Sequence, residues 1–337
     1  MDWFERLTGF REQGYDSNRS QLAVEGRELV SRVNGRRFGI GEMELLSLGE
    51  LRARARAAGG LPGRLRVGVV QGDVRKMHQS PENSGALFQV ASQFNLLEMV
   101  SPDVTPEQGV TRYQHDRTQG PACAMAAGAA TIYRNYFADV DGVQGQTAAR
   151  QLDGLADIGT ALGDALGRPV VQLWTMRNGY AMCTQSGLDA IAAHLESPDS
   201  VRTASLGDLL RIGVHWNVEV TDGAGPAAPH VSQAFCSALP VSYSPVAPSH
   251  WRVFASVVLR AAYEATMWAA VCNARRAGSN TVLLTRLGGG AFGNDEAWIQ
   301  AAMRSALQAV RECDLNVQLV SYGAPSADLL ELATEFG

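Results

Sequence analysis

Residues 280–321 read NTVLLTRLGGGAFGNDEAWIQAAMRSALQAVRECDLNVQLVS. The near-continuous apolar run from Asn280 to Leu287 predicts a buried strand, which leads directly into the glycine-rich run 288–293. A helix is expected from about Asp295 to Arg311, followed by a second strand at Asn316–Ser321. Strand, loop, helix and strand in this order form a parallel βαβ unit, whose sheet is covered on both faces. The stretch therefore predicts an α/β fold.

The glycine-rich run formally matches a dinucleotide-binding pattern, because Gly288-x-Gly290-x-x-Gly293 follows a strand and precedes a helix. Glycines let the backbone approach a pyrophosphate, and a helix N-terminus attracts its charge. A Rossmann site also needs an acidic residue where the next strand ends, and Val320–Gly323 contains none. A P-loop needs Lys followed by Ser or Thr, which is also missing. The run is therefore a phosphate loop of another type or a structural turn.

The composition describes a globular protein with a large core. The chain has 337 residues, of which 46% are hydrophobic, and a formal net charge of −5; these values exclude global disorder. No apolar run reaches the roughly 18 residues that span a membrane, and the acidic balance excludes a general nucleic-acid-binding surface. The first residues do not form a secretory signal, and the five scattered cysteines form no CxxC pair. We therefore expect a reduced, cytoplasmic protein.

The chain is expected to divide into a helical extension, residues 1–62, and one α/β domain, residues 63–337. The run Gly59–Gly63 contains three glycines and a proline, which is typical of a break between segments. Within the extension, Ser47 and Glu50 have the spacing of a capping box and predict the start of a helix that runs to about Ala58.

Two further elements are predicted in the middle of the chain. The run Val170–Trp174 is apolar apart from one glutamine and predicts a strand. Apolar residues spaced three or four apart from Phe254 to Cys272 predict one buried face of a long helix.

Polar residues follow two more predicted strands. Leu65–Val70 predicts a strand that ends at Gln71-Gly72-Asp73, where Asp73 can cap a helix or accept a hydrogen bond from an exocyclic amine such as that of adenine. Leu87–Asn95 predicts a second strand with a polar loop behind it. The amides of Gln93 and Asn95 could bind the hydroxyls of a ribose without adding charge, although Asn95 could also satisfy only its own turn.

Two carboxylates lie between that strand and the Ala-rich helix predicted from Gly120-Pro121 to Tyr136. Hydrolysis of a glycosidic bond needs a group that activates water and a proton for the leaving group. Glu98 and Asp116 are the candidates, and Gln119 would orient hydroxyls or water. The alternatives are an exposed loop acid for Glu98 and a surface ion pair with Arg117 for Asp116.

In their order along the chain, these pieces resemble a macrodomain. That family has a strand ending in Gly-Asp-Ile/Val, then a strand with an Asn-bearing loop, and a late strand that enters a glycine-rich loop. The resemblance covers about residues 65–137 and 280–323. It implies a three-layer α/β/α fold with a mixed, mainly parallel central sheet, and it leaves residues 138–279 as a large insertion or an elaborated half of the fold.

The resemblance also implies a site for ADP-ribose or an ADP-ribosylated substrate. Asp73 and Val74 would hold adenine, Asn95 would face the distal ribose, and the glycine-rich loop would surround the diphosphate. The usual glycine run after the Asn loop is missing, with Gly109-Val110 as a substitute, and so are the paired glutamates of poly(ADP-ribose) glycohydrolases. The expected binding residues are Asp73, Val74, Ser92, Gln93, Gly109, Val110, Gly288, Gly289, Gly290, Ala291, Phe292, Gly293 and Asn294; the expected catalytic residues are Asn95, Glu98, Asp116 and Gln119.

Three functions remain open at this point. The first is an enzyme that removes ADP-ribose from a modified substrate, and the second is a reader that binds ADP-ribose without catalysis. The third is a thiol-dependent amidase or transferase in which Cys123, at a helix N-terminus, is the nucleophile and His115 its partner. The six histidines have no metal-ligand spacing, so neither a metal nor a cofactor is predicted.

Overall fold

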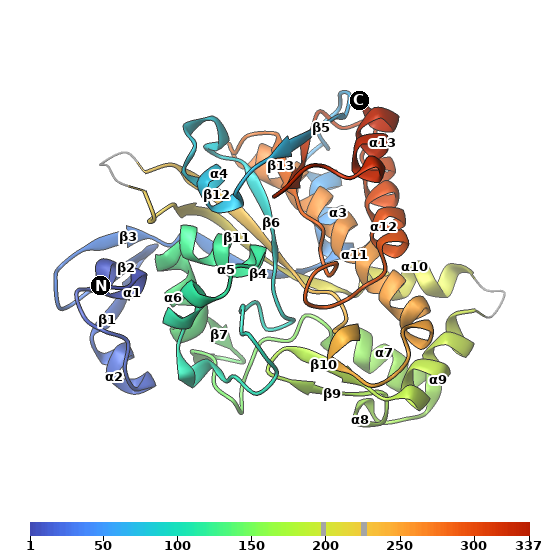
Figure 1. Cartoon of the computed structure of the whole chain (residues 1–337), viewed down its shortest axis with the longest axis horizontal. Coiled ribbons are helices and arrows are strands. Elements are labelled where there is room, and N and C mark those ends of the chain that lie inside the picture. The colour runs from blue at the N-terminus through green and yellow to red at the C-terminus, as the bar shows by residue number, and fades with distance from the viewer. Residues whose placement is uncertain (197–199, 224–227) are drawn as a thin grey trace.

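The computed structural model describes residues 1–196, 200–223 and 228–337. Its centre is a seven-stranded sheet in the order β4-β11-β12-β6-β13-β14-β5 (Figure 1). The last five strands in this order are parallel to one another, and β11 runs antiparallel to both of its neighbours. The bounds are β4 Glu42–Ser47, β5 Arg66–Gln71, β6 Leu87–Ala91, β11 Arg211–Glu219, β12 His230–Cys236, β13 Thr281–Leu284 and β14 Asn316–Ser321.

Side chains of the central strands are buried on both faces of the sheet. Successive residues of a strand point to opposite faces, and in β13 Val282 and Leu284 join one hydrophobic cluster while Leu283 joins another. Helices cover both clusters, so the molecule has three layers. The predicted α/β class, with a mixed and mainly parallel sheet flanked by helices, is confirmed.

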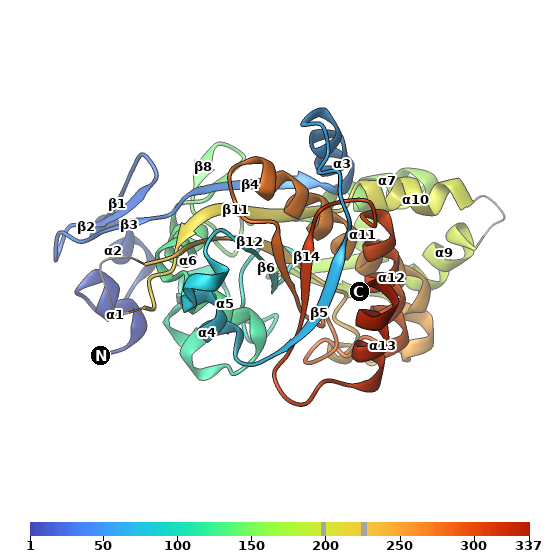
Figure 2. The ribbon, with the colours of Figure 1, turned by 90° about the horizontal axis from the view of Figure 1, so that it is seen from above.

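The helices of the two outer layers separate clearly when the molecule is seen from above (Figure 2). One layer packs on the cluster that contains Val282 and the other on the cluster that contains Leu283. The first layer consists of α3 Leu48–Ala57, α11 Pro248–Arg275, α12 Glu296–Ala309 and α13 Ala327–Phe336, and the second of α4 Val74–Gln79, α5 Gln119–Ala126 and α6 Gly128–Tyr136. The long helix predicted around Phe254–Cys272 is therefore confirmed as α11.

The N-terminal region is not wholly helical, and that expectation is wrong for residues 22–47. The helix α3 begins with the predicted capping box, in which Ser47 and Glu50 bond each other's backbone. Before it, however, lie α1 Trp3–Thr8, α2 Tyr15–Ser20, the small sheet β1 Leu22–Glu25, β2 Glu28–Ser31 and β3 Arg37–Gly39, and then β4. Because β4 pairs with β11, this region supplies an edge strand of the central sheet.

Residues 138–279 also supply part of the central sheet, through β11, β12 and the helix α11 behind it. The rest of this stretch holds shorter elements, which lie in green to yellow below the sheet in Figure 1. They are β7 Asp139–Val140, β8 Val143–Gln144, α7 Ala156–Leu166, α8 Val170–Leu173, β9 Trp174–Arg177, β10 Tyr180–Cys183, α9 Gln185–Leu195 and α10 Ser200–Asp208. The strand predicted at Val170–Trp174 is wrong, because Val170–Leu173 form a helical turn after Pro169, whose fixed φ suits a helix start.

The carboxyl ends of the five parallel strands lie at one edge of the sheet. The described part of the chain also contains four short 3₁₀ helices. These are η1 Pro81–Asn83, η2 Pro106–Gln108, η3 Thr111–His115 and η4 Val241–Tyr243. None of the helices in the described residues is both long and apolar enough to cross a membrane. In open parallel sheets, ligands bind beyond the carboxyl ends of the strands. The edge at which the five parallel strands end is therefore the expected position of a ligand site.

Candidate functional site

A cavity of about 300 Å³ lies at the carboxyl ends of β6, β12 and β13. Three segments far apart in the sequence build most of its wall: the loop after β6, the segment that enters α5, and the glycine-rich loop after β13. Among the residues predicted for the site, the lining contains Ser92, Gln93, Glu98, Asp116, Gln119, Gly288, Gly290, Ala291 and Phe292. The tertiary structure therefore brings most of the predicted residues into one cavity.

Of the two acidic residues that line this cavity in the described part of the chain, Glu98 is buried and Asp116 is partly exposed. The side chain of Glu98 is almost completely buried, and the residue is 2% exposed, so the alternative of an exposed loop acid is wrong. Burial raises the pKa of the Glu98 carboxyl to about 7, although the positive charge of Arg134 opposes this shift. Within the described residues, Oε2 of Glu98 has no hydrogen-bond partner. A carboxyl with such a pKa can both give and take a proton near neutral pH.

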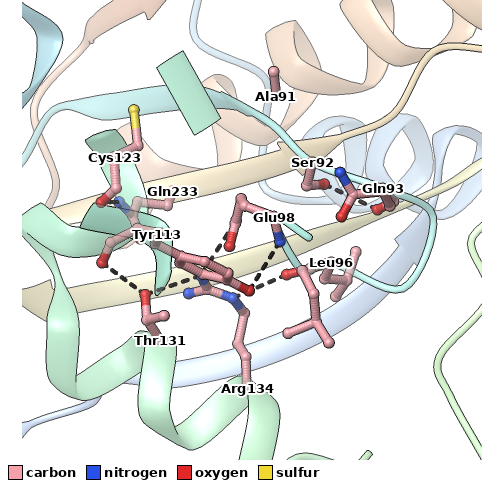
Figure 3. A network of polar contacts seen from close by, with 12 residues as sticks. Ala91, Ser92, Gln93, Leu96, Glu98, Tyr113, Cys123, Thr131, Arg134 and Gln233 are labelled. Atoms are coloured by element: carbon pink, nitrogen blue, oxygen red, sulfur yellow. Dashed lines mark hydrogen bonds and ion pairs between the residues drawn. The ribbon is translucent and has the colours of Figure 1, made fainter. Parts of the chain in front are cut away.

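Three elements hold Glu98 in place (Figure 3). Its backbone N–H donates to the hydroxyl of Tyr113, on η3, at 3.0 Å. Its Oε1 accepts a hydrogen bond from Nη2 of Arg134, on α6, at 3.4 Å. Gly120, at the start of α5, lies so close that an added Cβ would meet the Ala91 carbonyl and come within 3.2 Å of Cγ of Glu98.

The segment before α5 adds a second carboxylate. Asp116 lines the cavity, and its Oδ1 accepts a hydrogen bond from the N–H of Thr118 at 2.8 Å. The amide of Gln119 is engaged with the backbone of β6, since it accepts from the N–H of Ala91 and donates to the carbonyl of Gln89. Gln119 thus fastens α5 to the end of β6, while the other oxygen of Asp116 accepts no hydrogen bond from the described residues.

The glycine-rich loop is closed by its own side chains and backbone. Gly288 and Gly293 have φ of +79° and +67°, a conformation that favours glycine. Asn294, which does not line the cavity, closes the loop: its Nδ2 donates to the carbonyl of Leu239 at 2.9 Å, and its N–H donates to the carbonyl of Gly288 at 2.9 Å. Asn294 and Gly293 therefore shape the loop from behind, whereas nothing lies near the position of a Cβ on Gly290. Gly289 does not line the cavity. It packs instead against α12, where an added Cβ would lie 3.0 Å from Cδ1 of Ile299.

Several lining residues escaped the prediction. Arg286 lines the cavity beside the glycine-rich loop and forms an ion pair with Glu296. Tyr180 on β10 and Tyr243 on η4 pack on Phe292, with ring centroids 5.3 and 5.7 Å away. Both tyrosines come from the stretch 138–279, in which no motif marked them. The basic residue next to a glycine-rich loop is a signal that could have identified Arg286.

Asp73 and Val74 lie outside the lining of this cavity. The carboxylate of Asp73 accepts from the N–H of Arg75 at 2.9 Å, so the capping interpretation is confirmed, and Val74 packs in the core. Gly72 donates its N–H to the carbonyl of Ser321, which places the ends of β5 and β14 side by side. Asp73 therefore stands at the same edge of the sheet, beyond the cavity.

Asn95, Gly109 and Val110 also lie outside the lining. Oδ1 of Asn95 accepts from the N–H of Leu97 at 3.1 Å, which confirms that Asn95 satisfies its own turn. The carboxylate of Glu12 accepts from the N–H of Val110 at 2.9 Å and fills the space beside Gly109. Gly109 and Val110 therefore contact the N-terminal region. They do not replace the glycine run expected beside the ligand, because they do not line the cavity.

The thiol hypothesis is contradicted. Cys123 is fully buried, and burial raises the pKa of its thiol well above the usual value, whereas a nucleophilic thiol needs a lowered one. Its Sγ contacts Nε2 of Gln119, and His115 is exposed and contacts Gln114. Among the described residues, no group of three or more His, Cys, Asp or Glu side chains could hold a metal ion.

No model of a known protein family and no curated protein matches the sequence. Solved structures similar to the chain include poly(ADP-ribose) glycohydrolase from Deinococcus radiodurans in complex with ADP-ribose, at 13% identity and a TM-score of 0.46 over 87% of this chain and 93% of that one. The enzyme from Thermomonospora curvata matches at 13% identity and a TM-score of 0.44, over 94% of each chain. Its complex with the inhibitor ADP-HPD gives 12% and 0.44, over 94% and 93%. TM-scores at this level assign no activity, so the function rests on this chain's own residues.

Proposed function

We propose that this protein binds ADP-ribose through a macrodomain-like site and hydrolyses an ADP-ribosyl linkage. One observation carries the proposal: Glu98, whose buried Oε2 has no hydrogen-bond partner in the described part of the chain, shares a cavity with the glycine-rich loop after β13. A loop of this kind suits a diphosphate, and a carboxyl with a pKa of about 7 suits proton transfer to a glycosidic oxygen. A purely binding site would not need a carboxyl with a raised pKa.

The loop Gly288–Gly293 would bind the diphosphate through its backbone, with the guanidinium of Arg286 as a counter-charge. Phe292, Tyr180 and Tyr243 would give the distal ribose an apolar wall. Asp73 would accept a hydrogen bond from the amine of adenine; its place beside the end of β14, at the same edge of the sheet, supports this role.

In the proposed reaction, protonated Glu98 acts as the general acid. The bond between the anomeric carbon and the leaving oxygen breaks, and that oxygen takes the proton of Glu98. Water attacks the anomeric carbon and gives its proton to the carboxylate of Asp116, which lines the same cavity. Free ADP-ribose leaves, and exchange with solvent returns both carboxyls to their starting states.

Two measurements test this function. Isothermal titration calorimetry with ADP-ribose should detect binding, and incubation with an ADP-ribosylated protein should release free ADP-ribose, measured by chromatography. Binding without release would favour the reader. Absence of binding at millimolar ADP-ribose would refute both functions.

A further inference from the structure

Arg134 is a fully buried cation directly behind the cavity. It is 0% exposed, and it does not line the cavity itself. Its Nε donates to the carbonyl of Leu96 at 3.1 Å, and its Nη2 reaches both Oε1 of Glu98 at 3.4 Å and Oγ1 of Thr131 at 3.0 Å. The guanidinium also lies over the ring of Phe235, 3.8 Å from its centroid. These contacts fix both the plane and the position of the guanidinium.

The buried ion pair formed by Arg134 and Glu98 is not expected to add much to the free energy of unfolding. Burying two charges costs free energy that is recovered only when the remaining polar atoms are also satisfied. Within the described residues, Oε2 of Glu98 and Nη1 of Arg134 have no partner. Incompletely satisfied buried charges of this kind are typical of functional sites.

The backbone just before Glu98, which Arg134 also contacts, is held in a strained form. Leu96 has φ of +64°, a region that residues with a Cβ rarely adopt. The turn is fixed by the hydrogen bond from Arg134 to the Leu96 carbonyl and by the side chain of Asn95. Arg134 therefore holds both the loop that carries Glu98 and one oxygen of its carboxyl.

On the basis of the function proposed above, we propose that Arg134 is the positioning residue of this site. By binding the Leu96 carbonyl and Oε1 of Glu98 at once, it leaves Oε2, which is buried and has no hydrogen-bond partner within the described residues, as the oxygen that carries the proton for the substrate. Arg134 touches no substrate and works only through Glu98.

Among the described residues, the other ionisable groups that act on Glu98 and Arg134 come from three elements, η3, α5 and β11. Tyr113 on η3 and Cys123 on α5 interact with Glu98, and burial raises the pKa of both. His215 on β11 interacts with Arg134, and burial lowers its pKa well below the usual value, so it is neutral. Arg134 is thus the charged partner that favours ionisation of Glu98, even though burial lowers its own pKa.

The test follows the titration of Glu98 by NMR of protein labelled with ¹³C at glutamate carboxyls, with Glu98→Gln to assign the signal. In Arg134→Met the favourable charge is lost, so the titration midpoint of Glu98 should rise by about a unit or more. In Arg134→Lys the charge remains, so the midpoint should stay close to its original value while kcat falls roughly tenfold or more at unchanged KM. Thr131→Val removes the hydrogen bond that holds Nη2 of Arg134 in place beside Oε1 of Glu98. Because the guanidinium can then move away from Glu98, the titration midpoint of Glu98 should rise, but by less than in Arg134→Met.

The outcomes separate this proposal from the proposed function, because the titration needs no activity. A Glu98 midpoint that does not move in Arg134→Met, or in Thr131→Val where Arg134→Met does not fold, overturns the positioning role. Shifted midpoints in a protein that releases no ADP-ribose would support the arrangement of the pair and refute the hydrolase. Full kcat in Arg134→Lys would also overturn the role.

Discussion

The carboxylate of Glu12 occupies the space that a side chain on Gly109 would need. It accepts hydrogen bonds from the N–H groups of Val110 and Thr111, at 2.9 and 2.7 Å, and from the hydroxyl of Tyr136 at 2.7 Å. The N-terminal region thereby fixes the start of η3, which carries Tyr113. A residue near the chain start thus helps to support the backbone of Glu98.

Gly109→Ala should destabilise the protein by about 2–3 kcal/mol, because the new Cβ displaces Glu12 and leaves buried N–H groups unpaired. Gly142→Ala is a control for the positive φ alone: Gly142 also has φ of +80°, but nothing lies near its Cβ position, whereas Gly109 combines φ of +80° with ψ of 178°. It should cost only the backbone strain, about 1 kcal/mol. Urea unfolding of both variants measures the difference, and equal losses would contradict the role of Glu12.

Glu98→Gln should lower kcat by about 10²–10⁴-fold, the usual contribution of a general acid. Gln has nearly the same shape but cannot give a proton, so affinity for ADP-ribose should change little. Rates of ADP-ribose release and calorimetry on the same preparation measure the two quantities. A variant that retains full turnover would remove Glu98 from the mechanism.

The rate should depend on pH through the same carboxyl. Since the pKa of Glu98 is raised to about 7 and its protonated form is the active one, kcat/KM should fall above about pH 7, approaching tenfold per pH unit. A rate that instead rises through this range would assign Glu98 as a base. The profile is measured as initial rates between pH 5 and about 9.

Stability should depend on pH in a related way. A carboxyl whose pKa is higher in the folded than in the unfolded chain holds its proton more tightly when folded, so this contribution is present at low pH and is lost as pH rises. For Glu98 the window lies between its unfolded value of about 4.3 and about 7. Comparing the free energy of unfolding of the original protein and Glu98→Gln across this window should reveal the slope, and identical pH dependences would contradict the raised pKa.

Gly290→Glu should reduce affinity for ADP-ribose by about tenfold or more, because it places a carboxylate in the cavity against the diphosphate. Nothing lies near the Cβ position of Gly290, so the fold should survive. Gly14→Glu adds the same charge at an exposed glycine that is equally open. Calorimetry on both variants is decisive: unchanged affinity in Gly290→Glu would exclude the glycine-rich loop from the diphosphate site.

The sequence by itself determined the α/β class, because strand, loop and helix patterns are local. The strand Thr281–Leu284, its glycine-rich loop and the capping box at Ser47 were all predicted from neighbouring residues. The strands within residues 22–47 were missed, and no motif identified Tyr180, Tyr243 or Arg134.

Only the tertiary structure decided which polar residues share a cavity and which of them are buried. Asn95 and Glu98 are three residues apart, yet one closes a turn while the other faces the cavity, because Leu96 turns the backbone between them. Burial raises the pKa of Glu98, and the charge of Arg134, 36 residues away, limits that rise. Burial and long-range charge belong to the packed molecule, and local sequence patterns carry no information about either.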